Sequence, residues 1–97
     1  MIPQISYADY TIKGLLDCEL WLKARLTNRS ENLETAVQSF VNGFNAGRNG
    51  KDLWYYPNKM TVDQVFYYVD SKCSSNTQES VYTILSRYLD SRSGRKF

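Results

Sequence analysis

The sequence predicts an all-α fold, a compact bundle of about four helices that forms a single domain over residues 1–97. Apolar residues recur at spacings of three and four in four separate segments, as expected for amphipathic helices. No segment alternates apolar and polar residues over the length of a strand, so no substantial sheet is expected. The four predicted helices run roughly over residues 11–26, 31–46, 62–73 and 77–91. Residues 1–9 and 93–97 are expected to be flexible termini.

The second predicted helix has the clearest amphipathic spacing. Ser30 precedes it as a candidate N-cap, and Gly47 is well placed to end it in a left-handed conformation. Gly43 lies on the apolar side, where it would let a neighbouring helix approach closely and so justify its low helix propensity.

The last two predicted helices each begin with a capping pattern. Thr61 is followed three residues later by Gln64, which is the spacing of a capping box. Asn76 and Glu79 repeat this spacing before the last apolar stripe. We therefore expect Thr61 and Asn76 to be the N-caps of these helices.

Composition and charge argue against several classes of function. The net charge is +2, too weak to indicate a nucleic-acid or anionic-membrane partner. No apolar run reaches the roughly 18 residues of a transmembrane helix. Histidine, a glycine-rich phosphate loop and a nucleophile elbow are absent from the sequence. We therefore expect no enzyme, no catalytic residues, no metal site and no cofactor.

The two cysteines, Cys18 and Cys73, are compatible with a disulfide, with two free buried thiols or with part of a metal site. A zinc site needs about four ligands, and a redox pair is usually closely spaced. Closing a loop of this length would contribute about 4 kcal/mol to the stability of the fold. Energetics thus favour the disulfide, with two unpaired thiols in a reducing compartment as the alternative.

The segment between the second and third predicted helices is glycine-rich at first and aromatic afterwards. Trp54, Tyr55 and Tyr56 are consecutive and precede a proline, so they cannot all turn inward easily. Tyr and Trp are enriched at binding hot spots. One interpretation is that Trp54 and Tyr55 anchor a partner, with Tyr56 beside them. The other is that the loop folds back and at least one ring covers the core. In the first interpretation the register is set by three charged residues: Arg48, Lys51 and Asp52.

Three stretches resemble the HdeA-like group of small helical periplasmic proteins. They are DCELWL at residues 17–22, FVNGFNAG at 40–47 and VFYYVDSKCSSN at 65–76. The pattern covers most of the chain, from about Gly14 to Leu89. In that group a cysteine early in the first helix is bridged to one at the end of a later helix. The resemblance therefore implies a Cys18–Cys73 disulfide between the first helix and the end of the third.

The resemblance also implies an exported protein that binds other proteins. Residues 1–4 lack the basic start and apolar centre of a secretory signal, whereas the cysteines favour export. We therefore interpret Met1 as an introduced start that replaces a removed signal. The expected function is that of a periplasmic protein-binding protein, for example a stress chaperone that holds unfolded clients. The alternative is an immunity protein of the Rap/Tai type, which would neutralise one specific antibacterial toxin. A homodimer is a further expectation for an exposed apolar stripe.

Overall fold

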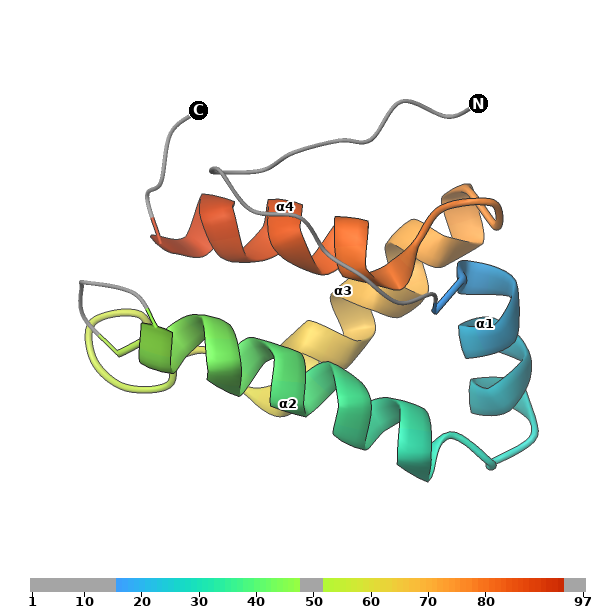
Figure 1. The fold of residues 1–97 in the computed structure, drawn as a ribbon, viewed down its shortest axis with the longest axis horizontal. Coiled ribbons are helices and arrows are strands. Elements are labelled where there is room, and N and C mark those ends of the chain that lie inside the picture. Colours follow the sequence, from blue (N-terminus) through green and yellow to red (C-terminus); the bar gives the residue numbers. More distant parts are fainter. Residues whose placement is uncertain (1–15, 48–51, 94–97) are drawn as a thin grey trace.

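The computed structural model describes residues 16–47 and 52–93, which form four helices and no strand. The helices are α1 (Cys18–Leu26), α2 (Glu31–Gly47), α3 (Val62–Ser75) and α4 (Val81–Ser93). Figure 1 shows α2 and α4 running across the molecule, α3 crossing behind them and α1 at one end. The predicted all-α fold is thereby confirmed. Ser93, expected in a flexible tail, is the last residue of α4, whereas residues 1–9 and 94–97 lie outside the described residues.

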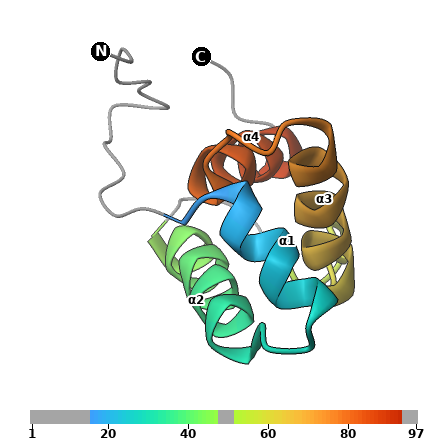
Figure 2. The same cartoon turned by 90° about the vertical axis from the view of Figure 1, so that its right-hand side faces the viewer.

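One hydrophobic core joins the four helices and the loop between α2 and α3. Helix α1 packs on α3, and both α2 and α3 pack on α4. Figure 2 shows α1 between α2 and α3. Every element contributes to the fully buried side chains, which include Trp21, Val37, Val41, Leu53, Val65, Val69, Leu85 and Leu89. Within residues 16–47 and 52–93, no helix is both long and apolar enough to cross a bilayer.

The Cys18–Cys73 disulfide is present and buried. Its Cα atoms are 4.9 Å apart, and it connects the first residue of α1 with the last turn of α3. The expectation that the first helix begins near residue 11 is wrong, because α1 begins at Cys18. The carboxylate of Asp17 accepts a hydrogen bond from the backbone N–H of Leu20 at 2.8 Å and caps α1 immediately before Cys18. Residues 11–15 lie outside the described residues.

The segment before α1 pairs with the turn between α3 and α4. The backbone N–H of Cys18 donates to the carbonyl of Glu79 at 3.0 Å, and that of Val81 donates to the carbonyl of Leu16 at 2.7 Å. This pairing sets the start of α4 at Val81. The predicted N-cap at Asn76 is therefore wrong: its side-chain oxygen accepts from the N–H of Gln78, in a local turn that ends α3.

The other predicted helix ends agree better with the structure. The capping box is present, because Thr61 Oγ1 accepts from the N–H of Gln64 while the Gln64 side chain accepts from the N–H of Thr61. Gly47 is the last residue of α2, but the expected left-handed conformation is wrong, because its φ lies outside the left-handed range. The expectation for Gly43 is wrong. It is exposed on α2, and no neighbouring atom of residues 16–47 and 52–93 lies within 4 Å of the position a Cβ would take, so none of the described helices approaches it closely.

A polar network joins α1, α2 and α3 beside the core. Asp70 on α3 accepts hydrogen bonds from the indole N–H of Trp21 at 2.7 Å and from Arg25 Nε and Nη2 at 3.1 and 2.8 Å. Arg25 Nη1 donates to Glu34 on α2 at 2.9 Å. The guanidinium lies 5.6 Å from the ring centroid of Trp21 and 5.5 Å from that of Phe66. Arg25 thus connects two neighbouring helices through a planar, bidentate contact that a lysine could not reproduce.

This network shifts the pKa values of two of its members. The hydrogen bond to Asp70 is the main cause that raises the pKa of Arg25 above its ordinary value. The pKa of Glu34 is lowered, first because the Ser30 hydroxyl donates a hydrogen bond to its carboxylate and then because Arg25 contacts it. Both shifts favour the charged forms of Arg25 and Glu34.

Candidate functional site

The aromatic turn, which we define as residues 52–60 between α2 and α3, lies at the end of the molecule remote from α1 (Figure 1). Leu53 and Met60 stand near its two ends with buried side chains. The N–H of Met60 donates to the carbonyl of Leu53 at 2.9 Å, and the N–H of Lys59 donates to the carbonyl of Tyr55 at the same distance. These bonds close the turn on itself and leave its tip pointing away from the core.

Two asparagines on α2 hold the first half of the aromatic turn. The side-chain oxygen of Asn45 accepts from the N–H of Leu53 at 2.9 Å, and its amide donates to Asp52 Oδ1 at 3.0 Å. One turn earlier, Asn42 accepts a hydrogen bond from the indole N–H of Trp54 at 2.9 Å. Asn42 and Asn45 are three residues apart, so they share one face of α2 and contact successive residues of the turn.

The second half of the aromatic turn is held by the end of α4. Arg92 Nη2 donates to the carbonyl of Asn58 at 2.7 Å, while the guanidinium lies 5.9 Å from the ring centroid of Tyr88. The Asn58 amide donates to the carbonyl of Asp52 at 3.1 Å. The turn is thus attached to two helices and across its own width, which restricts its motion without covering its tip.

The tip presents two tyrosines and a cation. The side chains of Tyr55 and Tyr56 are 72% and 79% exposed, among the largest exposures of any large hydrophobic residue in the described chain. Lys59 is also exposed, with its ammonium 5.6 Å from the ring centroid of Tyr56. The Tyr56–Pro57 peptide bond is cis, and Lys59 has a φ of 52°. This tip can offer a partner two aromatic faces, two phenolic hydroxyls and one positive charge.

The predicted partner-binding residues divide into two groups. Tyr55 and Tyr56 are exposed, whereas Trp54 is half-buried, packs against the core and has its indole N–H bound to Asn42. The carboxylate of Asp52 accepts from Asn45 and from the N–H of Trp54, and so shapes the turn.

Both interpretations of the loop therefore hold in part. The ring of Trp54 covers the core, whereas the rings of Tyr55 and Tyr56 face solvent. Arg48 and Lys51 lie outside the described residues.

The sequence did not single out Lys59, Arg92 or the two asparagines that hold the aromatic turn. Asn42 and Asn45 had a detectable signal, because they are polar and three residues apart on the helix that precedes the aromatic run. Arg92 had none, because its contact with Asn58 joins residues 34 apart in the chain.

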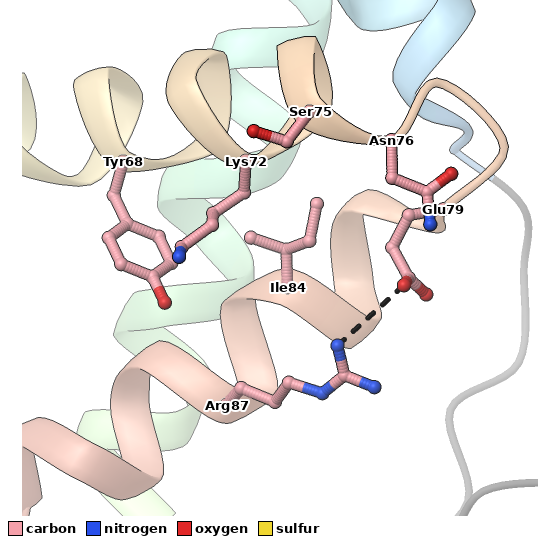
Figure 3. Close-up of a pocket in the computed structure, with 7 residues that line it drawn as sticks. All are labelled: Tyr68, Lys72, Ser75, Asn76, Glu79, Ile84 and Arg87. Carbon is pink, nitrogen blue, oxygen red and sulfur yellow. Dashed lines mark ion pairs between the residues drawn. The ribbon is translucent and has the colours of Figure 1, made fainter.

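A second surface feature is a cavity of about 270 Å³ between the end of α3 and the start of α4. Figure 3 shows Ile84 projecting from α4 toward α3, with Lys72 on one side and the Glu79–Arg87 pair on the other. Arg87 Nη1 lies 3.6 Å from Glu79 Oε2. The cavity adjoins the turn that pairs with α1, so it lies at the opposite end of the molecule from the aromatic turn (Figure 1).

In residues 16–47 and 52–93, no three histidine, cysteine or carboxylate side chains gather in a way that could hold a metal ion. What the chain does must be argued from the aromatic turn and the cavity, because comparison with protein families, curated proteins and solved structures found no match.

Proposed function

We propose that this chain is a non-enzymatic protein-binding domain of an oxidising compartment, which recognises one specific folded partner through the tip of the aromatic turn. The observation that carries the proposal is the contrast between the exposure of Tyr55 and Tyr56 and the firm attachment of the turn beneath them. Exposed tyrosines on a preorganised turn lose little conformational entropy when they enter a partner's pocket.

The buried disulfide supports an extracytosolic location. Disulfides form and persist in oxidising environments such as the bacterial periplasm and are rare in the cytosol. Cys18 and Cys73 are both fully buried, which is typical of a structural bridge. We therefore propose export, with the periplasm as the compartment that agrees with the resemblance to HdeA-like proteins.

Between the two functions considered from the sequence, the geometry favours a dedicated inhibitor, such as an immunity protein. A chaperone that holds unfolded clients needs a broad apolar surface. The large exposed apolar side chains of the described chain are instead distributed over three elements: Leu20 and Leu26 on α1, Tyr55 and Tyr56 in the turn, and Tyr67 on α3. A small rigid tip suits one complementary pocket better than many unrelated clients.

The test compares two variants of equally exposed tyrosines. Tyr55→Ala removes a ring from the tip, whereas Tyr67→Ala removes a ring with the same 72% exposure from α3. Neither should change the unfolding free energy by more than about 0.5 kcal/mol, because both rings face solvent. Purified wild type is immobilised on a support and incubated with periplasmic extract of the source organism. It should retain one polypeptide, and the retention should be saturable. The affinity of that polypeptide should fall at least about thirtyfold in Tyr55→Ala and stay unchanged in Tyr67→Ala.

Equal affinity of wild type and Tyr55→Ala for the retained protein would overturn the role of the aromatic turn. If wild type retained many unrelated polypeptides, and both Tyr55→Ala and Tyr67→Ala failed to retain them, the result would instead indicate binding by a general apolar surface.

A conditional chaperone is the second candidate, favoured by the ionic network around Arg25. Protonation of Glu34 would weaken the contact between α1 and α2 and loosen the helices over the core. Apolar-dye binding and protection of a denatured client should then appear together as the pH falls, with the disulfide intact. A protein that binds no dye and protects no client down to acidic pH would eliminate this candidate.

A further inference from the structure

We propose that the cavity between α3 and α4 binds a small organic carboxylate that carries an apolar group. The cavity volume of about 270 Å³ lies just under the usual range of small-molecule pockets, which begins near 300 Å³. A ligand the size of an aromatic acid would therefore fill it. The site lies at the other end of the molecule from the aromatic turn, and its argument does not depend on the proposed function.

Two cationic side chains from different helices face the cavity. Lys72 on α3 has its ammonium 5.5 Å from the ring centroid of Tyr68 and forms no ion pair with any residue of the described chain. Arg87 on α4 forms an ion pair with Glu79 through Nη1 and Oε2, 3.6 Å apart. Because Arg87 balances the carboxylate of Glu79, Lys72 leaves the described lining with a positive charge that favours an anion.

The centre of the cavity is apolar and well ordered by packing. Ile84 lines the cavity as a core residue that is only 4% exposed, so the half-buried Tyr68 supplies most of the apolar surface there. Beside it, the ring of Tyr68 packs against that of Tyr88 with centroids 4.3 Å apart. A ligand of purely ionic character would leave this surface in contact with water, whereas an apolar group would cover it.

The polar rim is held in place by backbone contacts. The Asn76 side-chain oxygen is engaged by Gln78, so its amide N–H₂ remains the group that can donate to a ligand. The carbonyl of Glu79 accepts from the N–H of Cys18, which anchors this rim to α1. The Asn76 amide can therefore donate to a ligand near the two cations while the hydrogen bonds that hold the rim stay in place. Donors from Lys72 and Asn76 match the acceptors of a carboxylate.

The test uses phenylpropionate as the probe, at low ionic strength, with binding followed by two-dimensional amide NMR of the full chain. Amides of α3 and α4 around Lys72, Asn76 and Ile84 should shift saturably, whereas those around Val41 on α2 should not. Phenylpropanol has the same ring without the charge, and acetate has the charge without the ring. Both should bind at least about tenfold more weakly than phenylpropionate.

Two variants of the lining should change the affinity in opposite directions. Lys72→Gln removes an attractive cation and should weaken phenylpropionate binding about tenfold. Glu79→Gln removes the competing carboxylate and should strengthen binding about threefold. Lys23→Gln, an exposed lysine on α1, is the matched charge control and should leave the affinity unchanged. Tyr55→Ala should also have no effect, which separates this site from the proposed protein-binding tip.

Three results would overturn the proposal: absence of saturable shifts at the cavity, equal affinity for phenylpropanol, or equal weakening by Lys72→Gln and Lys23→Gln. Acetate as strong as phenylpropionate would also overturn it, because the apolar base would then contribute nothing.

Discussion

At the scale of single residues, Arg25 on α1 joins that helix to both α2 and α3. Its guanidinium is bidentate on Asp70, contacts Glu34 and covers the rings of Trp21 and Phe66. The side chains of the three ionic groups are each about one-third exposed, so solvent screens their attraction. We therefore regard the network as a device that orients α1 and α2 on α3 rather than as the main source of stability.

The lowered pKa of Glu34 predicts a specific pH dependence of folding. Because the pKa is below its ordinary value of 4.5 in the folded protein, the charged carboxylate stabilises the fold fully above that value. This contribution is lost as the pH falls through the lowered pKa, when the folded carboxylate becomes protonated. Urea unfolding at a series of pH values should show wild type more stable than Glu34→Gln near neutral pH, with the difference shrinking as the pH falls below the ordinary value of 4.5.

The control for this prediction is Glu31→Gln, an exposed residue in the same first turn of α2. It should reproduce the pH profile of wild type. A difference between wild type and Glu34→Gln that stays constant over the whole range would contradict the assignment of the pH dependence to Glu34.

At the scale of elements, α2 contains a glycine that it does not need. Gly43 is exposed and lies well inside the ends of the helix, and a Cβ there would meet no atom of the described residues within 4 Å. Gly43→Ala should therefore raise the unfolding free energy by about 0.5–1 kcal/mol, because alanine loses less backbone entropy in a helix. Gly47→Ala, at the last residue of the same helix, should give a smaller gain. Destabilisation by Gly43→Ala in urea unfolding would show that this face of α2 contacts something the described residues do not include.

Helix ends were predictable where their signals are local. The capping box of α3 depends only on Thr61 and Gln64, and the structure has both of its hydrogen bonds. The start of α4 depends on a bond between Val81 and Leu16, which are 65 residues apart in the numbering, and no local pattern contains it. Asn76 was misleading because asparagine stabilises a turn after a helix as well as a cap before one.

In the aromatic turn, too, contacts between residues far apart in the sequence limited what could be predicted. Composition indicated that Trp54, Tyr55 and Tyr56 could not all be buried, and this is correct. Which ring faces inward depends on Asn42, whose side chain accepts the indole N–H of Trp54. The preceding residue, Leu53, enters the core and sets the direction of the chain. The three-dimensional position of α2 decides both contacts, so sequence alone could identify the region but not the residues that face a partner.

At the scale of the whole molecule, the two candidate surfaces have separate supports. The aromatic turn is attached to the end of α2 and the end of α4. The cavity lies beside the turn that pairs with Leu16 and Cys18. Core packing of α2 and α3 on α4 connects the two ends. A change that loosens α1 should therefore affect the cavity before it affects the aromatic turn.

The disulfide provides the way to test that order. Bridging residues that are 55 positions apart reduces the entropy of the unfolded chain, so Cys18→Ala/Cys73→Ala should lower the unfolding free energy by about 4 kcal/mol. That is a large fraction of the roughly 5–15 kcal/mol of a typical domain. Urea unfolding of the double variant measures the loss, and a loss below about 1 kcal/mol would contradict a stabilising role.

Where the double variant still folds, amide exchange should distinguish the two ends of the molecule. The N–H groups of Cys18 and Val81 themselves close the bridge between α1 and the α3–α4 turn, so position 18 and Val81 should lose protection most in the variant. The N–H of Met60 closes the aromatic turn. Its protection from exchange should fall only by the amount that corresponds to the loss of global unfolding free energy. Equal loss at both ends would show instead that the molecule opens as one cooperative unit, with the two surfaces coupled through the core.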